Sequence, residues 1–230
     1  MLREIYEEQF KRFCQMSEAD GRFMPTKEEQ LAVLDEDTPS HTARDYDWTY
    51  LTHCSWAARA LAKSKPRRHV DIGGYVYFAG LCSAFIPQFE FYDIRALDFP
   101  FGDLKCGRAD LTDLPFPDNS IPSLSCLHVL DHIGLGRYGD TLDAKGDIKA
   151  AKELARVLAP GGELLIVLPM DEKSRIAFNA HRLLSFKQAT VLFEGLNLSE
   201  FTMLYEQKII QSGFGFPKDT YTGCFVWTKL

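Results

Sequence analysis

One pattern constrains the fold of this chain more than any other: from Arg68 onward, short apolar runs alternate with stretches of helical periodicity. Such alternation is typical of βαβ units, in which crossover helices join parallel strands. The chain has 230 residues, a length that suits one such sheet with a single continuous core. The sequence therefore predicts an α/β fold with a doubly wound, Rossmann-like and mostly parallel sheet.

Apolar runs and helical periodicity place the expected elements. Strands are expected at residues 69–72, 89–94, 104–108, 124–129 and 163–168. Helices are expected at residues 48–63, from Phe78 onward, at 147–158 and at 185–194, the last opening with a capping box at Ser185 and Gln188. Two final strands, at 200–206 and 223–229, are predicted to form an antiparallel hairpin at one edge of the sheet.

A polar stretch at residues 35–47 is the one weak boundary in the chain. It separates a helical preface, residues 1–45, from a main domain, residues 46–230. In the preface, Leu2, Ile5, Phe10 and Phe13 fall on one stripe of an amphipathic helix, which predicts packing against another surface.

Composition excludes several classes of partner. A net charge of −6 without a basic face argues against nucleic acid. No apolar run is long enough for a membrane span, and the acidic N-terminus is unlike a secretory signal, so a cytoplasmic location is expected. The six cysteines are widely separated and lack zinc-like spacing, which predicts reduced thiols.

The turn after the first strand predicts a nucleoside site. Residues 69–74 read as an apolar strand that runs into Gly73 and Gly74, and a helix follows. Such a turn lets the backbone approach a ligand closely and aims helix N–H groups at it. Asp93 closes the second strand about 20 residues later, where a carboxylate can bind a ribose diol. A glycine turn can also serve steric needs alone.

Four runs in order carry a resemblance to a known family: DIGG at 71–74, ADLTDLPFPDNS at 109–120, HVLDHIG at 128–134 and ELARVLAPGGELLIVLP at 153–169. Together they resemble the landmarks of class I S-adenosylmethionine-dependent methyltransferases that act on small molecules. The chain resembles more closely a little-characterised bacterial family of methyltransferase-like domains, through HIGLGRYGD at 132–140 and FNAHR at 178–182. That family has no reaction to transfer.

The resemblance implies S-adenosylmethionine as cofactor. It places the methionine part at the glycine turn, the ribose at Asp93, the adenine beside Asp110 and Leu111, and the sulfonium near His128. The implied cofactor-binding set is Asp71, Gly73, Gly74, Tyr75, Asp93, Ile94, Asp110, Leu111 and His128. Tyr75 and Tyr77 stand where the family pattern has further glycines, so either they crowd the methionine carboxylate or Gly74 shifts the turn and restores clearance.

Polar residues beyond the fourth strand are the candidates for chemistry. His132 is the predicted proton acceptor, with Asp131 as its partner, although His132 could instead cap a turn. Arg137, Tyr138 and Asp140 are predicted to bind a polar acceptor or else to brace their loop. Asn179, His181 and Arg182 are predicted to contact substrate. The predicted acceptor is a small polar molecule, with a hydroxyl of a sugar or sugar-like metabolite as the methylated group.

The sequence also permits comparison with three other functions. A catalytically silent module that keeps the fold for binding or assembly is the alternative to an enzyme. Asp131, Asp140, Asp143 and Asp147 could hold a divalent cation, but no metal is predicted because acids in such a loop are commonly solvated. A nicotinamide-dependent oxidoreductase would need G-x-G-x-x-G at the first turn, which this sequence lacks. The oligomeric state is not predicted.

Overall fold

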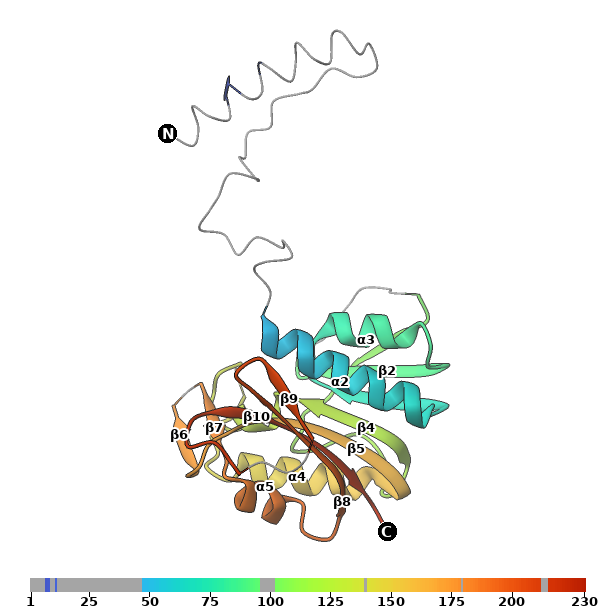
Figure 1. Cartoon of the computed structure of the whole chain (residues 1–230). Coiled ribbons are helices and arrows are strands. Elements are labelled where there is room, and N and C mark those ends of the chain that lie inside the picture. The colour runs from blue at the N-terminus through green and yellow to red at the C-terminus, as the bar shows by residue number, and fades with distance from the viewer. Residues whose placement is uncertain are drawn as a thin grey trace. The chain divides into compact units, whose positions relative to one another are not determined.

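The structure is a computed structural model that describes residues 7–8, 11, 47–95, 102–138, 140–178, 180–211 and 215–230. The chain divides into two compact units, Met1–Asp47 and Trp48–Leu230. Most of the helix predicted in the preface lies outside the described residues. All the helices and strands below belong to the second unit (Figure 1).

Eight strands form the central sheet, in the spatial order β3-β2-β1-β4-β5-β10-β8-β9. Their bounds are β1 Arg68–Ile72, β2 Gln88–Asp93, β3 Lys105–Arg108, β4 Ile121–Leu127, β5 Leu158–Met170, β8 Asn197–Tyr205, β9 Lys208–Ile210 and β10 Tyr221–Thr228. Strands β1 to β5 pair in parallel, while β10 pairs antiparallel with β5 and β8. The predicted α/β class with a mostly parallel sheet is confirmed.

The predicted C-terminal hairpin needs a correction. Strands β8 and β10 do pair antiparallel, but β10 lies inside the sheet between β5 and β8, and the short β9 forms the edge. The reason is burial: Tyr221 to Trp227 are all buried, so β10 needs a neighbour on each side. The three residues of β9 are exposed or half-buried, which suits an edge strand.

Helices cover both faces of the sheet (Figure 1). Their bounds are α2 Trp48–Ser64, α3 Val76–Ser83, α4 Gly146–Val157 and α5 Phe186–Leu192, with a 3₁₀ turn, η1, at Leu130–His132. Alternate residues of β5 serve the two layers, because successive side chains in a strand point to opposite faces. Leu165 and Val167 pack with α2 and α3, whereas Leu164 and Ile166 pack with α4.

The start of α5 forms only half of the predicted capping box. The Ser185 side chain accepts a hydrogen bond from the Gln188 N–H, as expected for an N-cap. The Ser185 N–H donates instead to the Ser174 hydroxyl, at 2.8 Å, so the return bond from Gln188 is replaced. The helix ends at Leu192, before the predicted Glu194.

Two further strands, β6 Arg175–Ala177 and β7 His181–Leu183, form a separate antiparallel pair that the sequence did not predict. Three residues are too few to show alternation. Of the run at 178–182, Phe178 and Ala180 lie between the two strands, and His181 and Arg182 lie on β7.

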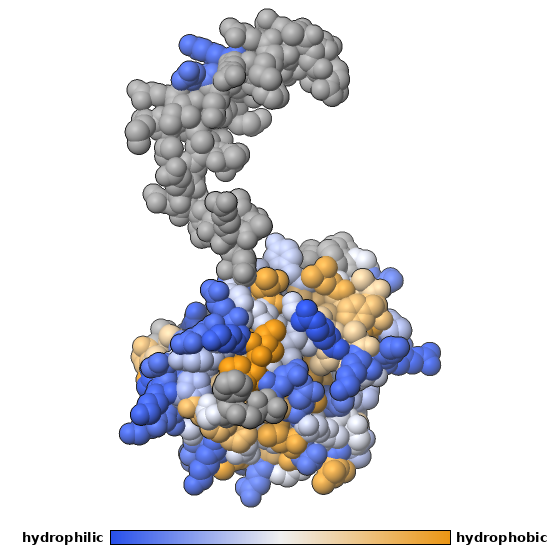
Figure 2. Space-filling view, viewed as in Figure 1, coloured by the Kyte–Doolittle hydropathy of each residue, from blue (hydrophilic) through white to orange (hydrophobic). Residues whose placement is uncertain are grey.

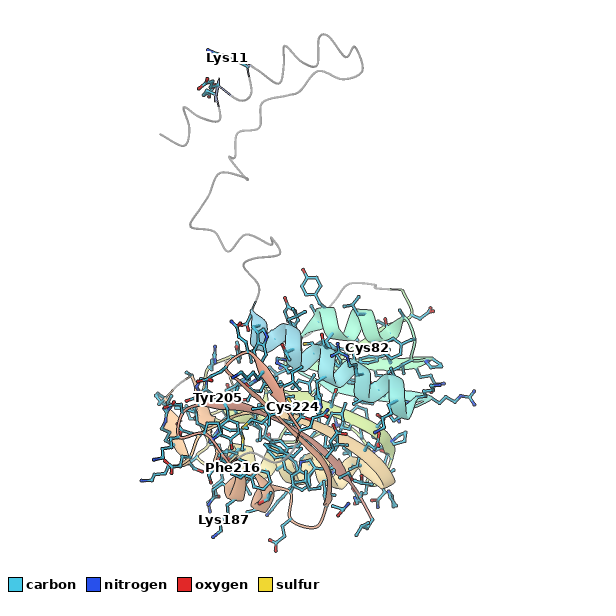
Figure 3. The ribbon with its side chains drawn as sticks, in the orientation of Figure 1. Lys11, Cys82, Lys187, Tyr205, Phe216 and Cys224 are labelled. Carbon is cyan, nitrogen blue, oxygen red and sulfur yellow. The ribbon has the colours of Figure 1, made fainter. Side chains whose placement is uncertain are left out.

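All five cysteines among the described residues are free thiols. Cys82 lies on α3 and Cys224 on β10, and both are buried (Figure 3). Burial raises the pKa of Cys82 to about 12, so it stays a neutral thiol. Within the described part of the chain, no helix combines the length and the apolar character that crossing a membrane requires.

Arg156 of α4 ties the segment between β3 and β4 to the helix. Its guanidinium donates to the carbonyls of Phe116 at 2.9 Å and Leu114 at 3.0 Å. It also pairs with Glu153 and Asp118, each at 2.7 Å. This segment carries Asp110 and Leu111, beside which the adenine is expected to lie. Arg156 therefore stabilises the segment that holds these two residues.

We expect Arg156→Met to lower the free energy of unfolding by about 1 to 3 kcal/mol, because two backbone carbonyls lose their charged donor. Urea unfolding measures the change. Arg175→Met is the matched control, since Arg175 is exposed and pairs with Asp171 on the surface, and its loss should cost less than about 1 kcal/mol. Equal losses for the two variants would contradict the role assigned to Arg156.

Candidate active site

A cavity of about 450 Å³ opens at the carboxyl ends of β1, β2 and β4. Gly73, Asp93 and His128, which directly follow or end these strands, all line it. Open α/β sheets bind ligands at this edge where the strand order reverses, here between β1 and β4. The volume lies within the usual range for small-molecule sites, about 300 to 1,000 Å³.

The glycine turn is dictated by its neighbours. Gly73 has a φ of +66°, and its N–H donates to the Tyr92 carbonyl at 2.6 Å. A Cβ at position 74 would lie 2.4 Å from Oδ2 of Asp71, so a side chain there would displace the carboxylate. A Cβ at position 73 would lie 3.0 Å from Cγ1 of Val129, which lines the cavity, so glycine keeps this part of the turn clear.

Asp71 itself is buried beneath the turn and belongs to a hydrogen-bonded chain. Its Oδ1 accepts from the Ser125 hydroxyl. The Ser125 oxygen lies 2.9 Å from Nε2 of His69, and Nδ1 of His69 lies 2.7 Å from the Ser123 hydroxyl. The Ser125 hydroxyl donates its hydrogen to Asp71, so it can only accept from His69. His69 therefore donates through Nε2 to Ser125 and accepts through Nδ1 from Ser123.

Burial sets the charge state of this chain. It lowers the pKa of His69 to about 3 and raises the pKa of Asp71 to about 7. His69 is therefore a neutral, structural histidine. Asp71 lies outside the cavity lining among the described residues, and its Oδ2 has no hydrogen-bond partner there. It supports the turn from below.

The two tyrosines that follow the glycines are both exposed. Tyr75 lines one wall and is 47% exposed, while Tyr77 is 67% exposed and is not among the described residues that line the cavity. The Tyr75 ring lies 5.7 Å from the ring of Tyr50 on α2 and 5.1 Å from that of Tyr77, measured between centroids. These rings stand at the rim of the glycine turn.

Asp93 lines the cavity, but an arginine already holds its carboxylate. Arg95 donates from Nε to Oδ1 at 2.8 Å and from Nη2 to Oδ2 at 3.0 Å. The backbone N–H of Arg95 adds a third bond to Oδ1, at 2.8 Å. Burial alone would raise the pKa of Asp93, but the bonds and charge of Arg95 lower it below its ordinary value.

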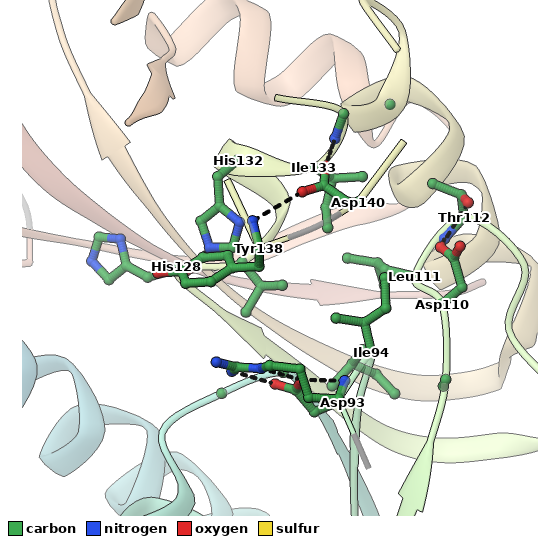
Figure 4. A pocket seen from close by; sticks show the side chains of 18 of the residues that line it. Asp93, Ile94, Asp110, Leu111, Thr112, His128, His132, Ile133, Tyr138 and Asp140 are labelled. Atoms are coloured by element: carbon green, nitrogen blue, oxygen red, sulfur yellow. Dashed lines mark hydrogen bonds and ion pairs between the residues drawn. The ribbon is translucent and has the colours of Figure 1, made fainter. Parts of the chain in front are cut away.

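The opposite end of the cavity is formed by the segment after β3. Asp110, Leu111 and Thr112 all line it, beside Ile94 (Figure 4). Oδ1 of Asp110 accepts from the backbone N–H and the hydroxyl of Thr112, at 2.8 and 2.7 Å. This local turn fixes the loop and presents the Leu111 side chain as an apolar surface.

His128 adopts a backbone conformation that is uncommon for histidine, with a φ of +56°. It lines the cavity, and its ring lies 4.8 Å from the ring of His53 and 5.8 Å from that of Tyr50. Its Nε2 is buried without a hydrogen-bond partner among the described residues. Burial lowers its pKa to about 3, so the ring is neutral.

His132 also lines the cavity, across from Asp93 (Figure 4). Its Nε2 lies 3.0 Å from the His128 carbonyl. A carbonyl only accepts, so Nε2 carries the proton and Nδ1 keeps its lone pair. Burial lowers the pKa of His132 below its ordinary value, which favours the neutral ring at neutral pH.

Asp131, the predicted partner of His132, lies elsewhere. Its side chain is buried, and it is not among the described residues that line the cavity or bond His132. Its Oδ1 has no hydrogen-bond partner in the described part of the chain. Burial raises its pKa to about 7.

The loop at residues 133–140 is organised by Asp140. Oδ2 accepts from the Gly134 N–H at 2.6 Å and from the Gly136 N–H at 3.3 Å, and Oδ1 accepts from the Tyr138 N–H. Gly134 and Gly136 have φ of +81° and +71°, a region that suits glycine. The Asp140 carboxylate lines the cavity, but its hydrogen bonds brace this loop.

The two arginines predicted to contact substrate differ in burial. Arg182 is buried and donates to the carbonyls of Ile133 and Asp143, with Asp147 at 3.6 Å, so it holds the loop in place. Arg137 is exposed and donates to the Ala180 carbonyl at 2.7 Å.

The remaining predicted substrate contacts lie at the edge of the site or beyond it. His181 is half-buried on β7 and is not among the described residues lining the cavity. Asn179 lies outside the described residues. Tyr138 lines the cavity, and its ring lies 4.9 Å from that of His132.

Acidic residues of the site are paired within the protein. Asp143 pairs with Lys149 at 2.6 Å, and Asp140 and Asp147 are engaged as described. Among the described residues, no three His, Cys, Asp or Glu side chains gather in a way that could hold a metal ion.

Sequence reasoning missed several residues that line the cavity. Tyr50 lies on a helix whose periodicity indicated only packing, and Arg95 follows the second strand without any motif. Thr112 could have been found, because a Thr two residues after an Asp commonly forms the local turn seen here. Thr141 and Lys149 are brought in by folding of the loop alone.

Comparison with known sequences is sparse. No curated protein sequence matches the chain. The family model described as "Caenorhabditis protein of unknown function, DUF268" matches residues 119–211, which is less than half of the chain. That stretch contains both runs on which the resemblance to a bacterial family depends, and this finer resemblance stays a prediction.

Comparison with solved structures is informative about the fold. A protein from Galdieria sulphuraria, provisionally assigned as a sarcosine dimethylglycine methyltransferase, aligns with a TM-score of 0.58 at 16% identity, over 78% of this chain and 86% of that one. The N-methyltransferase NodS from Bradyrhizobium japonicum WM9, solved with S-adenosyl-L-homocysteine, gives 0.55 at 12%, over 84% and 93%. The [4+2]-cyclase SpnF gives 0.53 at 14%, over 75% and 80%.

The chain has the class I methyltransferase fold. The predicted resemblance to that superfamily is thereby confirmed at the level of architecture. At these identities the likeness extends to the methyltransferase fold and not to a reaction, as the presence of a cyclase among the similar structures illustrates.

The buried Asp131 gives a test of its structural role. Its folded pKa of about 7 exceeds the ordinary value of 3.8, so the folded protein binds this proton more tightly and stability falls as pH rises from about 4 to 7. We expect the free energy of unfolding to fall between pH 5 and pH 8 by about 2 to 3 kcal/mol more in wild type than in Asp131→Asn. Urea unfolding at both pH values measures this, and parallel changes in the two proteins would contradict it.

Proposed function

We propose that this chain binds S-adenosylmethionine and transfers its methyl group to a small-molecule acceptor. One observation carries the proposal: separate strands bring the glycine turn, the acid that ends β2 and the loop after β3 to the same cavity. Gly73, Asp93 and Leu111 stand there in the order that a methionine tail, a ribose and an adenine would need. The similar fold of methyltransferases supports the cofactor.

The residues present fit such a cofactor on their own chemistry. The turn at Gly73 and Gly74 has no side chain on the ligand side, Leu111 and Ile133 offer apolar surface for a planar base, and Asp93 has the charge that a diol binds. Tyr75 lines the cavity and Tyr77 is not among the described residues that line it, so we expect the turn to remain accessible. When bound, S-adenosylmethionine supplies an electrophilic methyl group for in-line displacement.

His132 is the group we assign to accept the acceptor's proton. Its Nε2–H is held by the His128 carbonyl, so the ring presents the unprotonated Nδ1 as the basic nitrogen. Its lowered pKa keeps it neutral, and therefore able to take a proton, near neutral pH. The edge contact with Tyr138 restricts the orientation of the ring.

The acceptor would lie between His132 and the wall formed by Tyr50, Tyr75 and His128. A sugar hydroxyl is one group that His132 could deprotonate, and it remains our sequence-based prediction for the acceptor. The support for it is reduced, because Asp140 and Arg182 bind backbone groups of their own loop.

A second candidate function is a silent module that keeps the fold for binding or assembly. One observation favours it: Arg95 already pairs with both carboxylate oxygens of Asp93, the group that a ribose would need. Titration with S-adenosyl-L-homocysteine distinguishes the two candidate functions.

Calorimetric titration with S-adenosyl-L-homocysteine tests the cofactor site. We expect wild type to bind and Asp93→Asn to bind about tenfold more weakly or worse, since hydrogen bonds to a charged group contribute about 1.5 to 3 kcal/mol. Asp118→Asn is the matched control, because Asp118 pairs with Arg156 outside the cavity lining. Absence of heat with wild type at millimolar ligand would refute the proposed function.

Turnover tests the assignment of His132. A metabolite extract supplies the acceptor, and release of S-adenosyl-L-homocysteine reports the turnover rate. We expect His132→Asn to lower this rate about 100-fold or more, the usual contribution of a general base. Its affinity for S-adenosyl-L-homocysteine should remain near wild type. His181→Asn is the control, because His181 is not among the described residues lining the cavity. Unchanged turnover in His132→Asn would remove it from the mechanism.

The pH dependence should follow from the same assignment. His132 must be neutral to accept a proton, so the rate should rise with pH through its lowered pKa and then level off. A rate that falls through this range would contradict the assignment.

A further inference from the structure

Two arginines gather on one tyrosine ring at the rim of the cavity. Cζ of Arg95 lies 5.1 Å from the centroid of the Tyr138 ring, and Cζ of Arg137 lies 5.2 Å from the same centroid. The arginines come from different segments, after β2 and after η1, and Tyr138 lines the cavity. The fold therefore places two guanidinium groups beside one ring, and of these three residues Arg95 and Tyr138 line the cavity.

The carboxylates near this pair are already engaged. Arg95 pairs with the Asp93 carboxylate, whereas Arg137 donates a hydrogen bond to the Ala180 carbonyl. Asp140 lies in the same loop, but its hydrogen bonds go to backbone N–H groups. Asp131 is buried with a raised pKa of about 7, so much of it is protonated near neutral pH.

Asp93 cannot serve Arg95 and a ribose at once. A carboxylate oxygen has two lone pairs, and Oδ1 already accepts from the N–H and the Nε of Arg95, while Oδ2 accepts from Nη2. One lone pair remains, whereas a ribose diol bound through both hydroxyls needs two. The cofactor must therefore displace the Arg95 side chain.

The displaced guanidinium has a place to go. The Arg95 side chain is 64% exposed, so it can swing without disturbing the core. Its Cζ already lies over the ring of Tyr138, and we expect cation–π attraction to keep the displaced group at the rim. There it joins Arg137, and two guanidinium groups supply the forked N–H donors that oxyanions bind.

From this arrangement we infer that Arg95 and Arg137, on the ring of Tyr138, bind an oxyanion of the methyl acceptor, so that the acceptor carries a carboxylate or phosphate group. The inference rests on the proposed function. It gives Arg95 two alternative partners: the Asp93 carboxylate before the cofactor binds, and the acceptor's anion afterwards.

Thermodynamic linkage follows from this exchange. An anion that binds Arg95 at the rim favours the state in which Asp93 is free, and that state is the one that binds the cofactor's ribose. Anion and cofactor must then strengthen each other's binding by the same factor.

Calorimetric titration of the full chain with S-adenosyl-L-homocysteine, at constant ionic strength, tests the linkage. Inorganic phosphate and acetate serve as probes for the two oxyanions. We expect wild type to bind the nucleoside several-fold more tightly when phosphate, acetate or both are present. Weakening, or no effect of either anion, would overturn the inference.

Variants separate the roles of the two arginines. Arg95→Met should tighten S-adenosyl-L-homocysteine binding about 2- to 5-fold without any anion, as expected for removal of a partly exposed ion pair, and should lose the anion effect. Arg137→Met should lose the anion effect without that gain, because it has no contact with Asp93 among the described residues. Arg175→Met, on an exposed ion pair away from the cavity lining, should behave as wild type.

The outcomes distinguish this inference from the proposed function. If wild type binds S-adenosyl-L-homocysteine but Arg95→Met binds it equally or more weakly, the exchange at Asp93 is wrong and the cofactor site stands. If none of the variants binds it in any buffer, both fall together.

Discussion

The buried carboxylate of Asp71 is the constraint on which the site depends. Ser125 of β4 donates to it across the junction with β1, and His69 and Ser123 complete a hydrogen-bonded chain between the two strands. The carboxylate fills the space where a side chain at position 74 would lie. The same carboxylate thus joins the central strands and requires glycine at position 74, where the strand order reverses.

The far wall of the cavity is built by long-range contacts to backbone groups. Arg182 of β7 holds the carbonyls of Ile133 and Asp143, and Asp140 holds the N–H groups of Gly134 and its neighbours. Polar residues that resemble substrate contacts in the sequence therefore act as braces. On this side of the cavity, His132 and Tyr138 remain to face a ligand (Figure 4).

The sequence predicted the parallel core well, because the apolar run of β5 and the glycine turn after β1 are distinctive and strands alternate with helices along the chain. It could not place β10 inside the sheet or find the three-residue strands β6 and β7, since burial from both sides and pairing are tertiary effects. At the site, Gly73, Asp93 and His132 were predicted from position. Arg95 was not, because its partner Asp93 and its stacking on Tyr138 appear only in three dimensions.

On the face shown in Figure 2, apolar residues are exposed among hydrophilic ones. Leu81 and Phe85, at and just after α3, are among the exposed apolar residues. A shared fold does not by itself decide which reaction a site performs. A crystal structure of the chain grown with S-adenosyl-L-homocysteine tests the central claim most directly. We expect the nucleoside to lie between Gly73 and Leu111, with its ribose on Asp93. An empty cavity with the rings of Tyr75 and Tyr77 folded over the turn would contradict the claim.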